Sequence, residues 1–343
     1  MLQIFVVTFP FFALIGAGYA AARWRLLRLD AIPGLNAFVL YFALPCMLYR
    51  FGSTTPIDQL LDVNVFVMWG VAALLLVALV VHASVRAGIG WNDAAFGALV
   101  AAFPNTGFMG VPLLLALLGA EAAGPIIITI VFDMLVTSSL CIALSRLDGA
   151  DQHGAAKALR QALRGVVVNP LPWSIALGTL ASAAQWRPPA PLWQTVSMLA
   201  DAASPVALFT IGAVLARSGM VARLAAHLAV AGAAAPVALA ASMPVQSRTA
   251  TRPWRAVLPI VFVKLLVHPM LVWLLGRAII SAGVPLSASA LVALVLVAAL
   301  PIASNVSMLA ERFGADNARI ARIILGTTAL AFFTFPVLTR WMR

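Results

Sequence analysis

The sequence is poor in charged residues. Only 10% of its 343 residues are Asp, Glu, Lys or Arg, and 11 of these are acidic, whereas 63% of the chain is hydrophobic. Soluble globular domains carry about 25% charged residues, so the composition excludes an ordinary soluble domain. We expect an all-α polytopic membrane protein embedded in a lipid bilayer, because helices satisfy their own backbone hydrogen bonds in lipid.

Cysteine is scarce, and the common enzyme motifs are missing. Cys46 and Cys141 both lie in apolar stretches without a partner at metal-ligand spacing, so we interpret them as core residues. The sequence contains no glycine-rich phosphate loop, paired-acid motif or Ser/His/Asp set. We therefore expect no catalytic residues, no cofactor and no metal, and we predict that the protein is not an enzyme.

The few charged residues are mostly basic, which gives a formal net charge of +11. They lie in short loops between apolar runs and form no continuous patch, so a nucleic-acid partner is not expected. The N-terminal apolar run also lacks the basic start and the small-residue cleavage site of a signal peptide, so none is expected.

Long apolar runs, by contrast, are abundant. Crossing about 30 Å of hydrocarbon takes about 20 apolar residues, and this length divides the chain into ten predicted spans. The predicted spans are residues 3–22, 32–51, 63–85, 93–118, 124–145, 166–184, 195–216, 254–276, 287–309 and 318–339.

The basic residues orient these spans. If both termini lie outside, sixteen of the 22 Lys and Arg residues face the cytoplasm and five face outward, while Lys264 lies within a span. This asymmetry predicts a cell inner-membrane protein with both termini on the non-cytoplasmic side. Residues 227–245 are also apolar, but counting them as a span would leave 13 basic residues inside and 8 outside. We interpret them as a buried or interfacial insert.

Matches between the two halves predict an internal repeat. Residues 10–18 align with 170–178 at an offset of 160, and residues 101–104 align with 298–301 at an offset of 197. The larger offset is explained by a cytoplasmic-side insert at about 217–253. Five spans per half make the second half enter the membrane in the opposite sense, as in an inverted repeat. The predicted domains are a first five-helix repeat at 1–145, a cytoplasmic linker at 146–165 and a second five-helix repeat at 166–343.

Two apolar runs contain a proline and an amide near their middle. Residues 101–107 are Ala-Ala-Phe-Pro-Asn-Thr-Gly, and residues 298–305 are Ala-Ala-Leu-Pro-Ile-Ala-Ser-Asn. Proline removes an intrahelical hydrogen bond, so we predict that both helices, the fourth and the ninth, are broken. Such breaks persist in a membrane only where they line a cavity, and a matched pair indicates the central site of a transporter.

The restart of each broken helix leaves N–H groups without a partner and forms a site for an anion. We predict that a small carboxylate binds there. The alternative is an ordinary proline kink whose amides are satisfied by neighbouring helices. The predicted substrate-binding residues are Pro104, Asn105, Thr106, Gly107, Pro301, Ser304 and Asn305.

Three ionisable residues lie inside predicted spans, where a charge requires a partner or water. Asp133 lies halfway through the fifth span, and Lys264 lies in the eighth span, one helical turn before His268. One interpretation is a structural ion pair between Asp133 and Lys264. The other is that Asp133 or His268 carries a proton that couples transport to the proton gradient.

Several motifs resemble the auxin efflux carrier family, whose members include bacterial malonate and malate carriers and plant PIN-type carriers. The most specific is residues 103–113, Phe-Pro-Asn-Thr-Gly-Phe-Met-Gly-Val-Pro-Leu. The resemblance covers nearly the whole chain. Supporting matches are residues 42–45, 203–209, 264–269 and 310–315, together with Thr327, Thr328 and Pro336.

The resemblance implies a scaffold of spans 1, 2, 6 and 7 and a transport unit of spans 3–5 and 8–10 that carries the substrate in an elevator-like movement. The broken helices 4 and 9 would cross each other inside that unit. It is also compatible with a homodimer that pairs through the scaffold. The short central loop lacks the long cytoplasmic domain of many plant carriers, so a bacterial carrier of small dicarboxylates such as malonate or malate fits better. The alternatives are a sodium-coupled symporter of related fold and an ion channel without alternating access.

Overall fold

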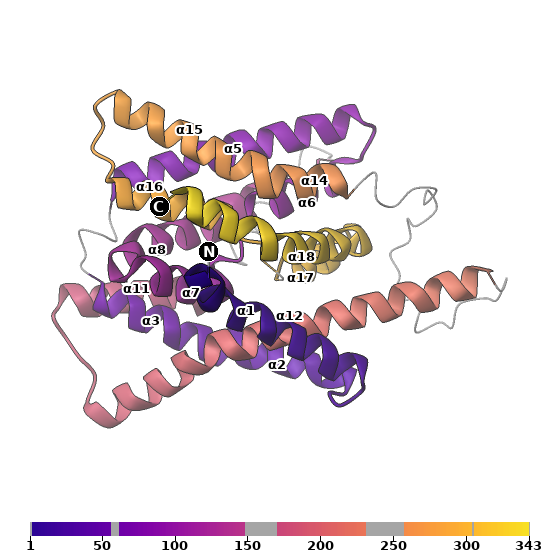
Figure 1. The fold of residues 1–343 in the computed structure, drawn as a ribbon, viewed down its shortest axis with the longest axis horizontal. Coiled ribbons are helices and arrows are strands. Elements are labelled where there is room, and N and C mark those ends of the chain that lie inside the picture. The colour runs from indigo at the N-terminus through magenta and orange to yellow at the C-terminus, as the bar shows by residue number, and fades with distance from the viewer. Residues whose placement is uncertain (1, 56–61, 148–169, 231–256, 304, 343) are drawn as a thin grey trace.

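Helices make up all of the regular structure in the described part of the chain. The computed structural model describes residues 2–55, 62–147, 170–230, 257–303 and 305–342. Figure 1 shows long helices that cross one another in a single bundle. Within these ranges the isolated β-type contact is an antiparallel bridge between Pro104 and Ile302. Most of the predicted linker at 146–165 and of the stretch at 227–245 lies outside the described residues.

Six helical segments of the described chain are long and apolar enough to cross a membrane. The protein is therefore a multi-pass helical membrane protein, while the predicted number of ten spans stays a prediction. Two shorter apolar helices, Thr106–Leu118 and Ala288–Ala298, adjoin the predicted breaks. The six segments are Leu29–Thr54, Val63–Arg86, Ala120–Leu144, Ala190–Arg217, Leu258–Ser281 and Arg319–Met342.

The first half of the chain contains both α-helices and tighter or wider helical turns. Pro33, Pro45 and Pro112 are the second residues of α2, α3 and α7, and Pro45 and Pro112 directly follow the wider turns η2 and η3 inside longer continuous helices. The elements are α1 Leu2–Arg23, η1 Leu29–Ala31, α2 Ile32–Phe38, η2 Val39–Ala43, α3 Leu44–Thr54, α5 Val63–Arg86, α6 Trp91–Ala102, η3 Thr106–Gly110, α7 Val111–Leu118, η4 Ala120–Ala122, α8 Ala123–Phe132, η5 Asp133–Thr137 and α9 Ser138–Leu144.

The second half contains one unusually long helix. Helix α12 continues without interruption through residue 217, where the insert was predicted to begin, and its end projects beyond the other helices in Figure 1. The elements are α11 Pro170–Ala183, α12 Ala190–Val230, α14 Leu258–Phe262, η8 Val263–Val267, α15 His268–Ser281, α16 Ala288–Ala298, α17 Asn305–Phe313 and α18 Asn317–Met342.

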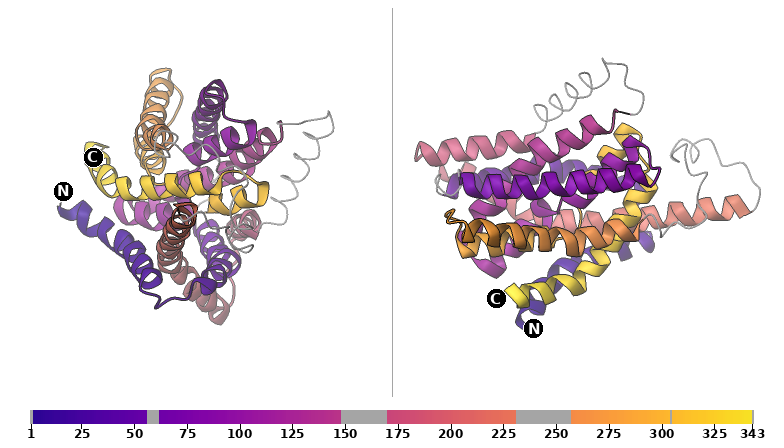
Figure 2. Two further views of the ribbon diagram at one scale, coloured as in Figure 1. Left: turned by 90° about the vertical axis from the view of Figure 1, so that its right-hand side faces the viewer. Right: turned by 90° about the horizontal axis from the view of Figure 1, so that it is seen from above.

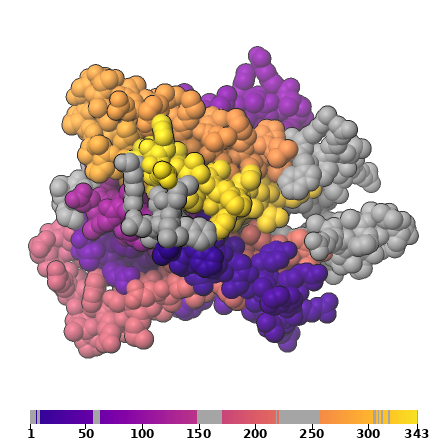
Figure 3. Space-filling view, viewed as in Figure 1, coloured from indigo at the N-terminus to yellow at the C-terminus, as the bar shows by residue number. Residues whose placement is uncertain are grey.

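Helices α5 and α15 lie side by side and expose apolar side chains outward, as a lipid-facing surface requires (Figures 1 and 2). On the face drawn in Figure 3, α15 and α18 lie above α1 and α12. Six of the outward side chains of the α5 and α14–α15 segments, each between 43% and 61% exposed, are Leu74, Leu75, Leu79, Phe262, Leu266 and Met270.

Glycines bring two helix pairs into backbone contact. A Cβ at Gly18 of α1 would clash with the carbonyl of Phe209 in α12, and a Cβ at Gly178 of α11 would clash with the carbonyl of Tyr49 in α3. Gly178 follows Gly18 by 160 residues, and Phe209 follows Tyr49 by the same number. This is the offset that relates the two halves in the sequence. Pairs α1–α12 and α3–α11 are therefore packed alike.

A second pair of glycine contacts repeats this relationship. A Cβ at Gly52 would meet the carbonyl of Ile175, and a Cβ at Gly212 would meet the carbonyl of Ile15. These residues are again 160 apart in the sequence. Small residues allow this close approach of helix backbones in membranes.

The two helices that precede the predicted breaks are the most enclosed. All residues from Ala94 to Ala102 of α6 are buried, as are those from Ala293 to Ala298 of α16. Any irregular backbone that follows these helices is therefore buried in protein instead of exposed to lipid, which is the condition for interrupting a helix at membrane depth.

Candidate functional site

The first interruption separates α6 from η3. Helix α6 ends at Ala102, and the chain resumes helical bonding at Thr106, after Pro104. The first bonds of the new helix run from Met109 N and Gly110 N to Asn105 O, at 3.2 and 2.9 Å. The N–H groups of Gly107 and Phe108 precede these bonds, so they have no place in the intrahelical ladder.

The second interruption separates α16 from α17. Helix α16 ends at Ala298, and α17 begins at Asn305. Predicted site residue Ser304 and the side chain of Asn305 lie outside the part of the chain that the structure describes. The position of Asn305 at the start of α17 is nevertheless the place where an N-terminal helix site would form.

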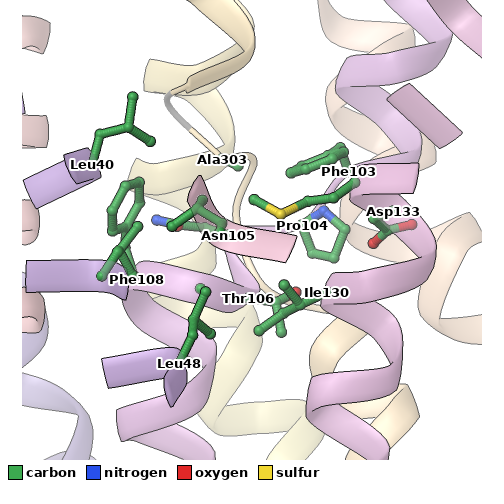
Figure 4. A pocket seen from close by; sticks show the side chains of 14 residues that line it. Leu40, Leu48, Phe103, Pro104, Asn105, Thr106, Phe108, Ile130, Asp133 and Ala303 are labelled. Atoms are coloured by element: carbon green, nitrogen blue, oxygen red, sulfur yellow. The ribbon is translucent and has the colours of Figure 1, made fainter. Parts of the chain in front are cut away.

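The two interruptions bind each other through their backbones. Asn105 N donates to Pro301 O at 2.8 Å, and Ala303 N donates to Phe103 O at 3.3 Å. The pair forms the antiparallel bridge centred on Pro104 and Ile302. Figure 4 shows Ala303 next to Asn105 and Pro104. Groups that proline excludes from helical bonding are thus satisfied by the opposite interruption.

A small cavity lies against the first interruption (Figure 4). The space that water-sized groups can occupy in it is about 30 Å³, which is room for one or two of them. Apolar side chains from α3, α8 and α11 close it on other sides. Its polar or backbone-exposing members are Asn105, Thr106, Gly107 and Asp133, and its apolar members include Leu48 and Ile130.

Three oxygen atoms of this lining are buried without a hydrogen-bond partner. They are Asn105 Oδ1, Thr106 Oγ1 and Asp133 Oδ2, and the three side chains are at most 3% exposed. Asn105 occupies the N-cap position, but its side chain makes no capping bond. Buried polar atoms are nearly always partnered, so these oxygens at the cavity are open to hydrogen bonds from a ligand or from water.

Gly107 and Gly110 have different surroundings. A Cβ at Gly107 would meet nothing within 4 Å, whereas a Cβ at Gly110 would lie 2.6 Å from Leu300 Cδ1. Gly110 therefore permits close packing of η3 on the second interruption. Gly107 leaves open space at the cavity.

Asp133 is held by two donors. Its Oδ1 accepts from Trp69 Nε1 at 3.1 Å and from Thr137 Oγ1 at 2.9 Å. Asp133 is also the first residue of the π-helical segment η5, and π-helical turns often occur at functional sites. The two bonds fix one carboxylate oxygen and leave the other at the cavity.

Lys264 has partners other than Asp133. Its Nζ donates to Ala298 O at 3.0 Å and lies 3.1 Å from His268 Nδ1. Ala298 is the last residue of α16, so Lys264 binds a carbonyl that the interruption leaves free. The structure brings Lys264, His268 and Asp133 together around Trp69, whose ring centroid is 5.5 Å from that of His268. The roles of the three residues stay predictions.

Sequence reasoning located part of this site. Pro104, Asn105, Thr106 and Gly107 line the cavity, and Pro301 accepts the backbone bond from Asn105. It missed the contact of Lys264 with the end of α16, although cations favour helix C-termini. It also missed the apolar lining, because nothing distinguishes those leucines from others in an apolar chain.

Comparison with known proteins gives a consistent picture. The family model described as "Membrane transport protein" matches residues 3–339. The "Putative malonate transporter" of Rhizobium meliloti is 28% identical over 349 residues, which cover 100% of this chain and 97% of that protein. The "Auxin efflux carrier component 4" of Arabidopsis thaliana is 26% identical over 144 residues, which cover 41% of this chain and 23% of the plant protein.

Proposed function

Because the chain belongs to the auxin efflux carrier family of membrane transport proteins, we propose that it is a secondary active transporter of a small organic anion. A carboxylate or dicarboxylate of the malonate or malate type is the proposed substrate. The similarity to a relative named for malonate along the full chain supports this substrate class.

The observation that carries the proposal is the backbone pairing of the two interruptions beside a buried cavity. It places the start of η3 at the cavity, where the N–H groups of Gly107 and Phe108 remain outside the helical ladder. Aligned peptide dipoles give such a helix start a partial positive charge, so it binds a carboxylate without a cationic side chain. The Asn105 amide adds a further donor.

The proposed site has a matching contribution from the second half. Pro104 and Pro301 hold the interruptions open, Thr106 and Gly107 line the first, and Ser304 and Asn305 supply the corresponding start of α17. A dicarboxylate needs two such positive ends, and two helix starts at one crossing point would supply them.

We further propose that the chain is an inverted repeat of two five-helix halves. The glycine contacts of α1 with α12 and of α3 with α11 support this arrangement, since both occur at the offset of 160. In this proposal α1, α2–α3, α11 and α12 form the scaffold, and the helices that surround the interruptions form the transport unit. Movement of that unit would widen the small cavity enough to admit the anion.

The remaining parts of the proposal concern topology and assembly. The excess of basic residues in predicted inner loops favours an inner-membrane location with both termini on the non-cytoplasmic side. A homodimer through the scaffold is compatible with the apolar outer faces of the helices. Transport instead of catalysis is the proposed activity, and the relatives are likewise named as a transporter and a carrier.

The test is malonate uptake into liposomes that contain the purified protein. We expect saturable uptake, exchange of internal for external malonate, and a loss of about ten- to a hundredfold for Asn105→Ala, which corresponds to one hydrogen bond to a charged group. Asn64→Ala is the matched control. Its Nδ2 donates a 2.9 Å hydrogen bond to Pro285 O, and Asn64 does not line the cavity.

Each outcome decides a different point. A conductance that does not saturate with substrate would indicate a channel and overturn the carrier. Normal uptake by a folded Asn105→Ala variant would remove Asn105 from the site. Failure of malonate, malate and other small carboxylates to be exchanged would overturn the substrate class.

A further inference from the structure

A groove much larger than the cavity at the crossing point separates α11 from α5 and α8. Its volume is about 760 Å³, which is within the range of ligand-binding pockets. Helices α5 and α8, together with η5, form one wall, and α11, which packs mainly on α3, forms the other. Met134 lines both spaces, but residues 103–108 of the first interruption line the small cavity and not the groove. We call this space the lateral groove.

The lining of the lateral groove is almost entirely hydrocarbon. Besides the indole of Trp173, the polar side chains of the described lining are Asp62 and Thr179. The Thr179 hydroxyl is already engaged, because it donates to Ile175 O within α11 at 2.9 Å. A site for a polar solute needs several convergent polar groups, so the lateral groove does not suit the proposed organic anion.

The groove opens toward the surface that faces lipid. Val63, Trp173 and Leu180 belong to its lining, and each is more than half exposed. Two of the helical segments that form the groove, Val63–Arg86 and Ala120–Leu144, are long and apolar enough to cross a membrane. Apolar spaces exclude water, and an empty space would leave the lining side chains without contacts. Lipid hydrocarbon is the material available at that depth.

The length of the groove matches one leaflet of the bilayer. Its lining runs along α8 and η5 from Ile127 to Leu135, and along α11 from Pro172 to Leu180. Eight residues of helix advance about 12 Å, and half of the hydrocarbon core is about 15 Å thick. A single acyl chain that lies along the helices therefore spans the groove from the membrane boundary toward the bilayer centre.

One end of the groove carries a negative charge. Asp62 directly precedes α5, where a membrane-length helix begins, so it lies at the level of the lipid headgroups. Its Oδ1 accepts from Asn64 N at 2.9 Å and from Val65 N at 3.1 Å. Both bonds use the same oxygen, so Oδ2 can accept from a headgroup.

The charge of Asp62 selects among headgroups. The ammonium group of phosphatidylethanolamine has both a positive charge and N–H donors, which gives a charge-assisted hydrogen bond with a carboxylate. Phosphatidylcholine has the positive charge without an N–H donor, and phosphatidylglycerol has a net negative charge that Asp62 repels.

We propose that the lateral groove binds one phosphatidylethanolamine molecule, with an acyl chain between α11 and α8 and with the ammonium group at Asp62. This binding does not depend on the proposed transport function. Its consequence does, because the lipid would lie between α11 of the proposed scaffold and α5 and α8 of the proposed transport unit. Interdigitated side chains resist sliding, whereas a fluid acyl chain at that boundary permits it.

The test is quenching of Trp173 fluorescence by phospholipids with brominated acyl chains. The full-length protein is reconstituted into phosphatidylcholine vesicles that contain a rising mole fraction of one brominated lipid. The difference between the wild type and Trp173→Phe isolates the signal of Trp173. We expect half-maximal quenching at a mole fraction about fivefold lower for phosphatidylethanolamine than for phosphatidylcholine or phosphatidylglycerol.

Two variants with matched controls locate the lipid. Asp62→Asn should abolish the preference for phosphatidylethanolamine, because asparagine still caps α5 but has no charge. Glu121→Gln should keep the preference, since Glu121 precedes α8 and does not line the groove. Ala176→Phe should fill the groove and abolish quenching at low mole fraction. Leu177→Phe, on the same helix but outside the lining, should leave it unchanged.

Distinct results would overturn the inference. Quenching that rises in proportion to mole fraction, equally for the three lipids, would show contact with bulk lipid only. Tighter binding of phosphatidylglycerol would contradict the role of Asp62, and an unchanged preference in a folded Ala176→Phe variant would exclude the groove. Absence of Trp173 quenching by every lipid would mean that protein fills the groove. Because no arm measures transport, failure of malonate uptake would count against the proposed function alone.

Discussion

At the scale of single residues, polar side chains near the crossing point are divided between fixed and free atoms. Asp133 is bound through Oδ1 and free at Oδ2, and Lys264 is bound to the last carbonyl of α16. The hydrogen-bonded atoms stabilise the arrangement of the helices around the crossing point, while the unpartnered oxygen of Asp133 belongs to the lining of the cavity. The bound atoms therefore predict effects on stability, and the free ones predict effects on transport.

Trp69→Phe should lower the free energy of unfolding by about 1–3 kcal/mol, because it removes a donor from a buried carboxylate oxygen. Thr137 would remain as the partner of Asp133 Oδ1. Thermal or chemical unfolding of the detergent-purified protein measures the change. Trp24→Phe is the control, since Trp24 is 73% exposed. Equal stability of the two variants would show that the Trp69 bond contributes little.

Single residues also show where sequence reasoning succeeds. Pro104 and Pro301 predicted the places where helices stop, because proline lacks an N–H group wherever it occurs. The partner of Lys264 was beyond prediction from sequence. From residue type alone, the acidic Asp133 is the expected partner of Lys264. Lys264 instead donates to the backbone carbonyl of Ala298, a group that every residue carries.

At the scale of elements, close packing depends on a few glycines. Gly18 and Gly212 bring α1 against the backbone of α12, and Gly52 and Gly178 bring α3 against α11. Their value lies in the absence of a Cβ, which lets backbones touch. The π-helical segments η2, η3, η5 and η8 belong to this scale as well. They were not predicted, although a proline is the second residue of the α-helix that follows η2, η3 and η8, and a missing N–H group disturbs the regular bonding there; η5 has no such mark.

Gly212→Ala should destabilise the protein by about 3 kcal/mol, the upper end of overpacking effects, because the new methyl group would meet the carbonyl of Ile15. Gly16→Ala is the matched control in α1, since a Cβ there would meet nothing within 4 Å. Denaturant unfolding in detergent measures both variants. An unaffected Gly212→Ala variant would mean that α1 and α12 separate at little cost.

The long helix α12 shows a limit of reading elements from charge. Arg217 and Arg223 indicated the end of a span, and the sequence predicted an insert there. Arginine and alanine are good helix formers, so the helix continues past the predicted boundary to Val230. Charge indicates where the lipid-facing part of the helix ends, and helix propensity carries the helix past that point.

At the scale of the whole molecule, the multi-pass helical architecture was predicted from composition and run length. The number of spans, their orientation and the division into moving and static units remain predictions, since the bilayer and a second conformation determine them. One hydrogen bond joins the proposed scaffold to the proposed transport unit at the crossing point. Ser204 Oγ of α12 donates to Phe108 O of η3 at 3.2 Å.

Cross-linking at that contact should stop transport. Cysteines at positions 204 and 108, in a background with Cys46→Ala and Cys141→Ala, join the proposed scaffold to the proposed transport unit. A bifunctional maleimide should reduce malonate uptake at least tenfold, and uptake into proteoliposomes measures it. The matched control is the pair Arg50→Cys and Asp201→Cys. The native side chains form a 2.8 Å salt bridge between α3 and α12, within the proposed scaffold, so the cross-linked control should stay active. Activity of both cross-linked proteins would contradict a sliding unit.

The bridge between the two interruptions is made of main-chain atoms, Asn105 N with Pro301 O and Ala303 N with Phe103 O. Side chains around it can therefore be exchanged without loss of the crossing itself. A protein of this design can acquire a new cargo through a few substitutions in its lining, while the machinery that moves the cargo is inherited intact.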